Sequence, residues 1–468
     1  MIVAGQKGWG HFMPQHYKIN PRLRAILITT ACACAVSCTS AQGMTLKYES
    51  SLAAQQSHLD RTTKKTVKDP DIHEKDELVI QLGSDRIKIS SPKETDVFDF
   101  KNRRLLVIND KTKTYTDSSL YMLCGFRAAE VRNRMFINQV LEAANVEKNF
   151  SGTSFDIGSE LGMPIPGGLE NPGITISTDN GKTVFKYRGN VVTEVTFKPE
   201  DASACMPMYS KLLLYHCHLH PYIRKQIVAS NHIIDSLSYS FVEAEGARTE
   251  SLRLIDQSPA DADLNVPANY RRTFSPSPIS QFQEQIFASD KVNMSAPDAV
   301  VAQAQSLVAQ NRSLDACLTL IEYSLATGEQ ATPEMFNILK QLTTNPLVVQ
   351  LQNAVEPNSK EDALKALGVL EKLRVQCSQK AYIIDLYRAN ISETLGQNPR
   401  TLFLSALKGN NLLTGAYKDF GMYCYRSYDM QLAWDCWDLA RRIRPDDSIL
   451  GEVTSLEKNL SDTYPEYF

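Results

Sequence analysis

The chain has 468 residues, of which 43% are hydrophobic and 22% are charged, with 50 Lys and Arg against 53 Asp and Glu. This composition is typical of a globular protein, and the length is enough for two to three domains. The near balance of charge argues against a dedicated nucleic-acid surface, so we expect no nucleic-acid partner.

The first recognisable pattern is an export signal in residues 1–41. Lys18, Arg22 and Arg24 precede the apolar run 25–36, which has the length of a secretory hydrophobic region and is too short to span a membrane. The sequence therefore predicts an exported protein of the outer membrane or periplasm of a Gram-negative bacterium.

Two processing outcomes remain open for this signal. Residues 35–38, Ala-Val-Ser-Cys, resemble a bacterial lipobox, although that motif prefers Leu at the first position and Gly or Ala before the cysteine. The resemblance implies that Cys38 is lipidated and holds the protein on the membrane. Residues 39–41, Thr-Ser-Ala, instead suit ordinary cleavage before Gln42, which would release a soluble secreted protein.

Residues 42–75 are polar and charged and are interpreted as a tether. Residues 76–256 are predicted to form an antiparallel domain, because short strand-like runs alternate with turn signals. Helical spacing predicts a helix over 119–145 and a second helical segment over 208–230, broken near Pro221. The predicted strands are 78–82, 86–90, 97–100, 105–109, 112–116, 174–178, 183–187, 191–197 and a final hairpin across Glu245-Gly246.

The order of these elements predicts an α+β fold. Strand runs are interrupted by two helices without regular strand–helix–strand alternation, so we expect an antiparallel sheet with helices on one face. The hairpin at 105–116 resembles one found in curved-sheet envelope proteins, including the half-barrels of periplasmic lipoprotein carriers and outer-membrane lipoproteins. That resemblance implies an open, strongly bent sheet that cups an apolar ligand such as a lipid.

One cluster in this domain has the atom types of a metal site. His216, Cys217, His218 and His220 lie within five residues, and imidazole and thiolate suit zinc or copper. Read as a helix, the segment places His216 and His220 on one face with Cys217 on a flank. The alternative is a helix whose histidines cap its end ahead of Pro221, and no second metal motif such as HExxH supports a site.

Residues 257–295, rich in Pro, Asp, Ser and Ala, are interpreted as a linker to a helical domain over 296–468. Helix-period runs occur at 299–326, 363–377, 381–395, 400–413 and 450–460. Seven cysteines follow the signal, an odd and scattered set that does not form a disulfide framework. They are Cys124, Cys205, Cys217, Cys317, Cys377, Cys424 and Cys436.

The clearest repeat unit is the helical hairpin 417–445. Its apolar, small and terminating residues follow the spacing of the 34-residue tetratricopeptide repeat, which this segment resembles. The matching positions are Tyr417, Phe420, Gly421, Ala433, Trp437, Ala440 and Pro445. The resemblance implies that Gly421 allows close helix approach and that neighbouring helix pairs stack into an array.

Tetratricopeptide arrays bind protein partners, and this resemblance predicts a non-enzymatic interaction scaffold with an unidentified protein partner. Tyr423, Tyr425 and Trp434 are candidate partner contacts, although aromatic residues at such spacing are more often core. No GxSxG, P-loop or GxGxxG motif is present, so we expect no enzyme activity and no cofactor. The alternatives are a carrier of an apolar ligand and a metal-dependent enzyme at His216–His220.

Overall fold

The computed structural model describes residues 43–59, 66–68, 72–144, 154–165, 171–243, 246–259, 265–289, 292, 294–377, 379–445 and 448–468. The chain divides into two compact units. The sheet unit comprises Ser40–Asp290, Phe420–Arg442 and Ser448–Phe468. The helical unit comprises Lys291–Asp419 and Ile443–Asp447.

The sheet unit is built on one 13-stranded sheet with the order β13-β7-β6-β5-β4-β3-β1-β12-β11-β10-β9-β8, and β2 pairs with β1 off this path. Its strands are β1 (Met44–Leu59), β2 (Thr66–Lys68), β3 (Ile72–Leu82), β4 (Arg86–Ser90), β5 (Thr95–Asp99), β6 (Arg104–Asn109), β7 (Thr114–Ser119), β8 (Ile174–Asp179), β9 (Lys182–Tyr187), β10 (Asn190–Asp201), β11 (His232–Glu243), β12 (Gly246–Pro259) and β13 (Arg271–Arg272). The neighbours pair antiparallel, except β13 with β7. The predicted antiparallel α+β class is confirmed.

The tether predicted over 42–75 is wrong for most of its described residues. Met44–Leu59 is β1, which pairs with β12 on one side and β3 on the other. Leu46 and Tyr48 are buried while Lys47 between them is exposed, which is the alternation of a strand with one covered face. The segment is polar on average because its outer face is polar. Composition alone therefore did not reveal that it is a central strand.

The predicted hairpin turns lie close to their expected places. Asn180 and Gly181 both have positive φ, 49° and 77°, and join β8 to β9 as a two-residue turn. At the turn between β9 and β10 the positive φ values belong to Arg188 and Gly189. Residues 109–114 join β6 to β7, which lie close to the predicted strands 105–109 and 112–116.

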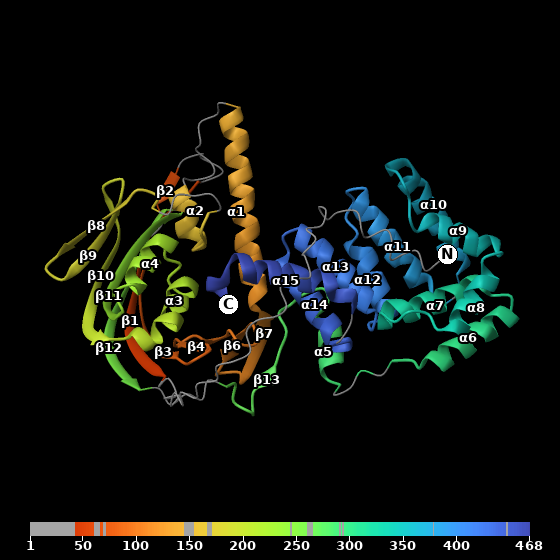
Figure 1. Cartoon of the computed structure of the whole chain (residues 1–468), viewed down its shortest axis with the longest axis horizontal. Coiled ribbons are helices and arrows are strands. Elements are labelled where there is room, and N and C mark those ends of the chain that lie inside the picture. The colour runs from red at the N-terminus through yellow and green to blue at the C-terminus, as the bar shows by residue number, and fades with distance from the viewer. Residues whose placement is uncertain are drawn as a thin grey trace, which may run out of the picture. The chain divides into compact units, whose positions relative to one another are not determined.

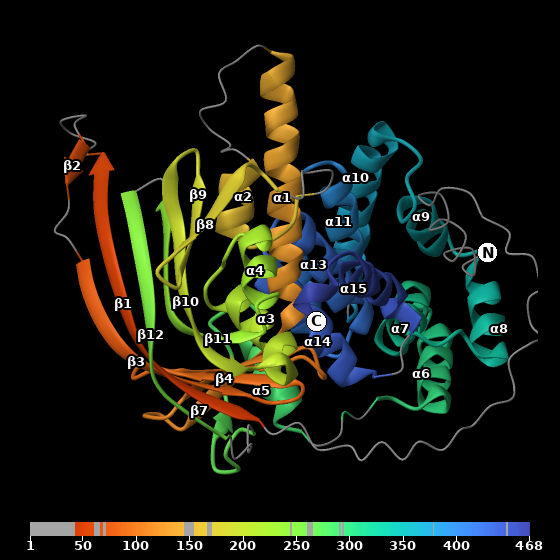
Figure 2. The ribbon, with the colours of Figure 1, turned by 60° about the vertical axis from the view of Figure 1, so that its left-hand side comes forward.

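Helices of the sheet unit pack inside the curve of the sheet. Figures 1 and 2 show α3 (Met206–Tyr215) and α4 (Pro221–Val228) against its inner face. The Tyr48 hydroxyl of β1 lies 2.9 Å from that of Tyr209 on α3, and the rings of Phe98 and Tyr215 are 4.8 Å apart. α3 is therefore seated on the sheet by buried aromatic side chains.

Two further helices complete the first part of this unit. α1 (Leu120–Ala143) begins at the predicted place, where Ser119 caps it by accepting the N–H of Tyr121 at 3.3 Å. α2 (Ser154–Leu161) was not predicted.

The predicted linker 257–295 contains β13 and α5 (Ser280–Phe287). α5 forms because Phe282 and Ile286 give it a buried apolar face. The linker interpretation is wrong for these residues.

The helical unit is a series of paired helices. Its members are α6 (Pro297–Ala309), α7 (Ser313–Thr327), α8 (Pro333–Leu342), α9 (Pro346–Ala354), α10 (Lys360–Gln376), α11 (Ala381–Thr394), α12 (Arg400–Gly409) and the start of α13 (Thr414–Arg426). α6 packs on α7, α9 on α10, and α11 on both α10 and α12. Pro begins α6, α8 and α9, where its missing N–H costs no helical hydrogen bond.

The last helices do not belong to the helical unit, which corrects the predicted domain 296–468. From Phe420 the chain joins the sheet unit, which includes α14 (Met430–Ile443) as far as Arg442, and α15 (Gly451–Thr463). α14 ends before Pro445, as predicted. Most of the helical unit, Lys291–Asp419, is therefore an insertion in the sequence of the sheet unit.

Candidate functional site

Six of the seven hairpin residues predicted to pack the repeat are buried, and the seventh, Pro445, is exposed. Tyr417, Phe420, Ala433, Trp437 and Ala440 are fully covered. A Cβ placed on Gly421 would lie 2.3 Å from Nε1 of Trp437, so only glycine allows this approach of α13 to α14. The packing expectation for these positions agrees with the structure.

Trp434, a predicted partner contact, is 1% exposed. Its indole N–H donates to Glu457 Oε1 on α15 at 3.1 Å. A Cβ on Gly125 of α1 would lie 2.7 Å from its six-membered ring, so the ring lies directly on α1. The interpretation as a partner contact is wrong, because α14 is covered by the sheet unit's own helices.

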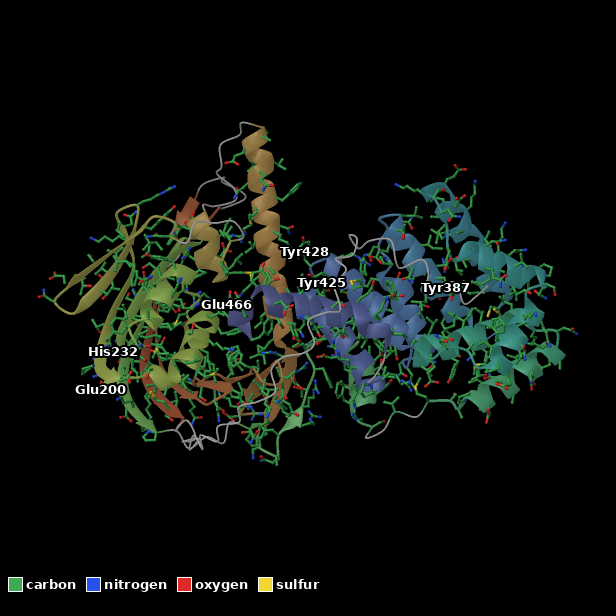
Figure 3. The ribbon with its side chains drawn as sticks, in the orientation of Figure 1. Glu200, His232, Tyr387, Tyr425, Tyr428 and Glu466 are labelled. Carbon is green, nitrogen blue, oxygen red and sulfur yellow. The ribbon has the colours of Figure 1, made fainter. Side chains whose placement is uncertain are left out.

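The two predicted tyrosine contacts are half-buried. Tyr423 stacks on Phe420 with ring centroids 6.5 Å apart, and Tyr425 stands edge-on to Trp434 at 5.8 Å. Tyr428, which the sequence did not single out, is 45% exposed and its hydroxyl donates to Asn133 of α1 at 2.7 Å. Figure 3 shows Tyr425 and Tyr428 near α1. Their positions leave only part of each ring for a partner.

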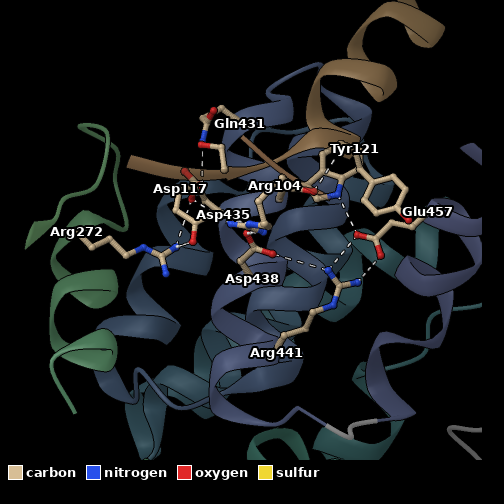
Figure 4. Close-up of polar contacts among 12 residues, drawn as sticks. Arg104, Asp117, Tyr121, Arg272, Gln431, Asp435, Asp438, Arg441 and Glu457 are labelled. Atoms are coloured by element: carbon tan, nitrogen blue, oxygen red, sulfur yellow. Dashed lines mark hydrogen bonds and ion pairs between the residues drawn. The ribbon is translucent and has the colours of Figure 1, made fainter. Parts of the chain in front are cut away.

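A charged network joins α14 to the sheet (Figure 4). Arg104 of β6 bonds Asp117 of β7 at 2.6 Å and Asp438 of α14 at 2.7 Å. Arg441 of α14 bonds both carboxylate oxygens of Glu457, at 3.0 and 2.7 Å. Because each charge has a partner of opposite sign, the network can fix α14 in place without leaving an isolated buried ion. It has no group that resembles a catalytic centre.

The histidine cluster does not form the helix expected for it. α3 ends at Tyr215 and α4 begins at Pro221, so residues 216–220 are a connection in which His218 has a φ of +49°. A residue before proline avoids the helical region, which explains the break. His216 and His220 are therefore not related by a helical turn, and this part of the prediction is wrong.

Two histidines of the cluster bond other groups, and its cysteine is buried. His220 Nδ1 accepts the N–H of Tyr222 at 3.1 Å and caps α4, and His218 Nδ1 accepts from Arg127 at 2.9 Å. Burial raises the pKa of the Cys217 thiol to about 12, which keeps it protonated. Among the residues that the structure describes, no three His, Cys, Asp or Glu side chains are placed to hold a metal.

In the part of the chain that the structure describes, Cys205 and His232, the next residues of these types in the sequence on either side, do not complete a metal site with that cluster. His232 Nδ1 lies 3.2 Å from the carbonyl oxygen of Glu200 (Figure 3), and the Cys205 thiol donates to the carbonyl of Ala202 at 3.2 Å. The seven cysteines of the described chain are all free thiols. This agrees with the expectation of no disulfide framework.

A cavity of about 310 Å³ lies in the helical unit. Its wall is formed by α6, α7, the start of α11 and the segment after α12. A Cβ on Gly409 would lie 2.2 Å from the Tyr382 ring, so the absence of a side chain there lets Tyr382 lie against the chain. A volume of this size is at the lower end of ligand pockets.

Polar side chains in this cavity converge on one carboxylate. Glu322 accepts hydrogen bonds from Lys380, Tyr382 and Asn410, the last at 2.7 Å. Lys380 Nζ also donates to the Tyr382 hydroxyl at 3.2 Å. Burial and the bond to Glu322 raise the pKa of Tyr382, so its hydroxyl stays protonated and donates. The ammonium and carboxylate compensate each other, and the cavity has no net charge from this group.

Sequence reasoning missed this cavity entirely. Glu322 lies on α7, Lys380 and Tyr382 lie at the start of α11, and Asn410 follows α12, so these residues are far apart in the sequence and carry no shared motif. No family model matches the chain, and no curated protein matches it. Paired helices are thus established, while the tetratricopeptide and lipoprotein-carrier resemblances rest on the sequence alone.

The predicted lipid-attachment residue Cys38 lies outside the described residues. Within the described part, no helix is long and apolar enough to cross a membrane. The inner face of the sheet, where the half-barrel resemblance implied an apolar ligand, carries α3 and α4 (Figure 2).

Proposed function

We propose that this protein is a non-enzymatic interaction protein of the cell envelope, and that the cavity of the helical unit receives an uncharged side chain of a protein partner. The observation that carries the proposal is the cavity itself, with the Glu322 carboxylate fully occupied by donors from its own walls. Helix pairs present such concave sites to partners.

The charge balance of the cavity selects the kind of side chain. A charged side chain that entered the cavity would find Glu322 and Lys380 already paired with each other. It would lose its hydration without gaining a partner of opposite charge. Val300, Ala326 and Leu412 add apolar wall, while the exposed Gln303 at the edge can bond a peptide group. These properties favour a neutral side chain entering from an extended segment.

Site-specific photocrosslinking in the native host tests this proposal. A photoreactive residue at Gln303 should capture one discrete partner, and the same residue at Gln305 should not. Gln305 is exposed on the same helix but does not line the cavity. Adding Tyr382→Ala should abolish the Gln303 adduct. Equal adducts at both positions, or one that survives Tyr382→Ala, would count against the cavity as the docking site.

We also propose that Cys38 carries the lipid anchor. The support is the lipobox-like segment before it. Mass determination of the mature N-terminus should give an acylated Cys38, and Cys38→Ala should move the protein from the membrane fraction to the soluble fraction. A mature chain that begins at Gln42 would exclude the anchor.

A further inference from the structure

The last turns of α1 project from the sheet unit. Figures 1 and 2 show this end of the helix extending beyond the sheet and beyond the other helices of the unit. The first half of α1 buries Cys124, Ala128 and Val131, whereas none of the described residues 132–143 is buried. About three turns of helix therefore face water, and an isolated helix of this length is marginal without a packed face.

An apolar stripe runs along α1 onto this projecting end. Phe126, Phe136, Ile137 and Val140, here called the α1 stripe, are all exposed, Phe136 by 66%. Phe126, Asn133 and Val140 recur every seven residues, and Phe136 lies three residues after Asn133. These are the a and d spacings of a helix that packs against a second helix.

Contacts to two neighbours hold α1 beside the stripe. The Tyr428 hydroxyl, from the turn between α13 and α14, donates to Asn133 Oδ1 at 2.7 Å, so its exposed ring lies next to the stripe (Figure 3). Arg134 Nη2 donates to Glu160 of α2 at 2.7 Å, and Arg134 Nε donates to Glu130 at 2.8 Å. The stripe therefore has a fixed direction within the sheet unit and continues onto an aromatic ring of a second element.

One cation flanks the stripe. Arg132 is exposed, and it forms no ion pair with a residue that the structure describes. With Phe126 and Asn133 at a positions, Arg132 stands at a g position, from which charged side chains reach across to a second helix. An acidic side chain on that second helix would pair with Arg132.

The charges distinguish between possible occupants of this surface. A second copy of α1 offers Arg132 no available acid, because its flank carries Glu130, which bonds Arg134, and the uncharged Ile137 and Gln139. Membrane-binding segments carry clusters of about four to eight basic residues, whereas the projecting end has two arginines, and Arg134 is bonded to two glutamates. A separate helix with an acidic flank is the occupant that these charges fit.

We propose that the α1 stripe and Tyr428 form a docking surface for an amphipathic helix of a partner protein, with an apolar seam and an acidic flank that meets Arg132. The partner helix covers the exposed apolar side chains, and the burial of that surface drives the association. Binding also orders turns that are weakly held in the free chain. The surface lies in the sheet unit and does not depend on the cavity of the helical unit.

Fluorescence anisotropy of two labelled probe peptides, measured with the full chain, tests the surface. Both probes are three heptads long with Leu at a and d, and one carries Glu and the other Lys at e and g, so like charges oppose self-association of each probe. The Glu probe should bind saturably, and the Lys probe should bind several-fold more weakly. Phe136→Ala should weaken binding of the Glu probe roughly tenfold, as for loss of an aromatic anchor. Val375→Ala, at an exposed apolar position of α10, is the matched control and should bind as the wild type does.

Arg132→Glu tests the charged flank. This variant should bind the Glu probe more weakly and the Lys probe more tightly than the wild type does, whereas a merely structural role of Arg132 would change both affinities alike. Hydrogen exchange provides the location. Amides of residues 132–143 should exchange quickly in the free chain and slowly when the Glu probe is bound.

The proposal is overturned if Phe136→Ala binds the Glu probe as the wild type does, or if Arg132→Glu keeps the wild-type preference. It also fails if sedimentation shows a wild-type dimer that Phe136→Ala dissociates, because a second copy then covers the stripe. Binding to phosphatidylglycerol vesicles that Phe136→Ala abolishes, with neither peptide bound, would assign the stripe to a membrane instead.

Discussion

At the scale of single residues, Gly421 and Trp437 connect sequence to packing most directly. Their spacing in the sequence predicts a close helix contact, and the structure leaves no room for a Cβ at Gly421. Trp434, three residues from Trp437, has the same chemistry but a different neighbour, Gly125 of α1. The first contact is local in sequence and could be predicted; the second joins distant segments and could not.

Gly421→Ala should destabilise the protein by about 2 kcal/mol or more, because the added methyl group overlaps a fully buried indole. Urea unfolding followed by tryptophan fluorescence measures it, since Trp434 and Trp437 are the tryptophans of the described chain. Gly368→Ala is the matched control in α10, where a Cβ meets nothing within 4 Å. It should stabilise its helix by about 0.5–1 kcal/mol. Equal effects of the two variants would show that α13 and α14 move apart to accept the methyl group at Gly421.

Asp435 should make the protein less stable as the pH rises. Burial raises its pKa to about 6, above the ordinary value of 3.8. The folded state therefore favours the protonated acid, so this contribution is complete below about pH 4 and is lost as pH rises through about 6. The free energy of unfolding of the wild type, relative to Asp435→Asn, should fall by about 3 kcal/mol across that window.

Urea unfolding at pH 4 to 8 provides the measurement for Asp435. Asp256→Asn removes a carboxylate at an exposed position on β12 and serves as the control. A difference for Asp435→Asn that does not change with pH would place its carboxylate in water rather than in the folded interior.

At the scale of elements, α14 illustrates how a tertiary partner decides the role of a helix. Its sequence fits an array of helix pairs, yet its polar edge carries Asp438 and Arg441, which bond β6 and α15. The periodicity of a helix shows which face is apolar but does not show what covers that face. The predicted strands and the break at Pro221 are local features, and they agree with the structure for that reason.

Arg104→Met should weaken the attachment of α14 to the sheet by roughly 3 kcal/mol, because Asp117 and Asp438 lose their shared cation while they stay largely covered. Tryptophan fluorescence during urea unfolding should report an earlier transition. Lys365→Met, which breaks the exposed pair with Glu361 on α10, should change stability by less than about 0.5 kcal/mol. Comparable losses from both variants would mean that the network contributes no more than a surface ion pair.

At the scale of the whole molecule, the sheet unit is discontinuous in sequence. Its strands lie before residue 290, and α14 and α15 return to it after the helical insertion. The amino-acid composition changes near residue 257, where the predicted linker begins. Composition could not show that residues 420–468 belong to the sheet unit, because amphipathic helices would suit the sheet unit and the helical unit equally. The α+β class was therefore predictable, whereas the assignment of the last helices to a unit was not.

A fragment of residues 43–290 should not fold cooperatively alone, because the surfaces that α14 and α15 cover would face water. Co-expression with residues 420–468 should yield a soluble complex of the two fragments. Near-ultraviolet circular dichroism and co-purification provide the readouts. Cooperative unfolding of 43–290 without the second fragment would contradict the discontinuous unit.

The insertion also sets the order in which a nascent chain can complete its parts. When synthesis has reached residue 419, most of the helical unit has emerged, while the sheet still lacks the segment 420–468. Long-range pairing is the slow step of folding, and exposed apolar surface attracts aggregation and chaperones meanwhile. The strands that are synthesised first therefore depend on helices that are synthesised last. If synthesis stops between the two, the sheet lacks the helices that complete its unit.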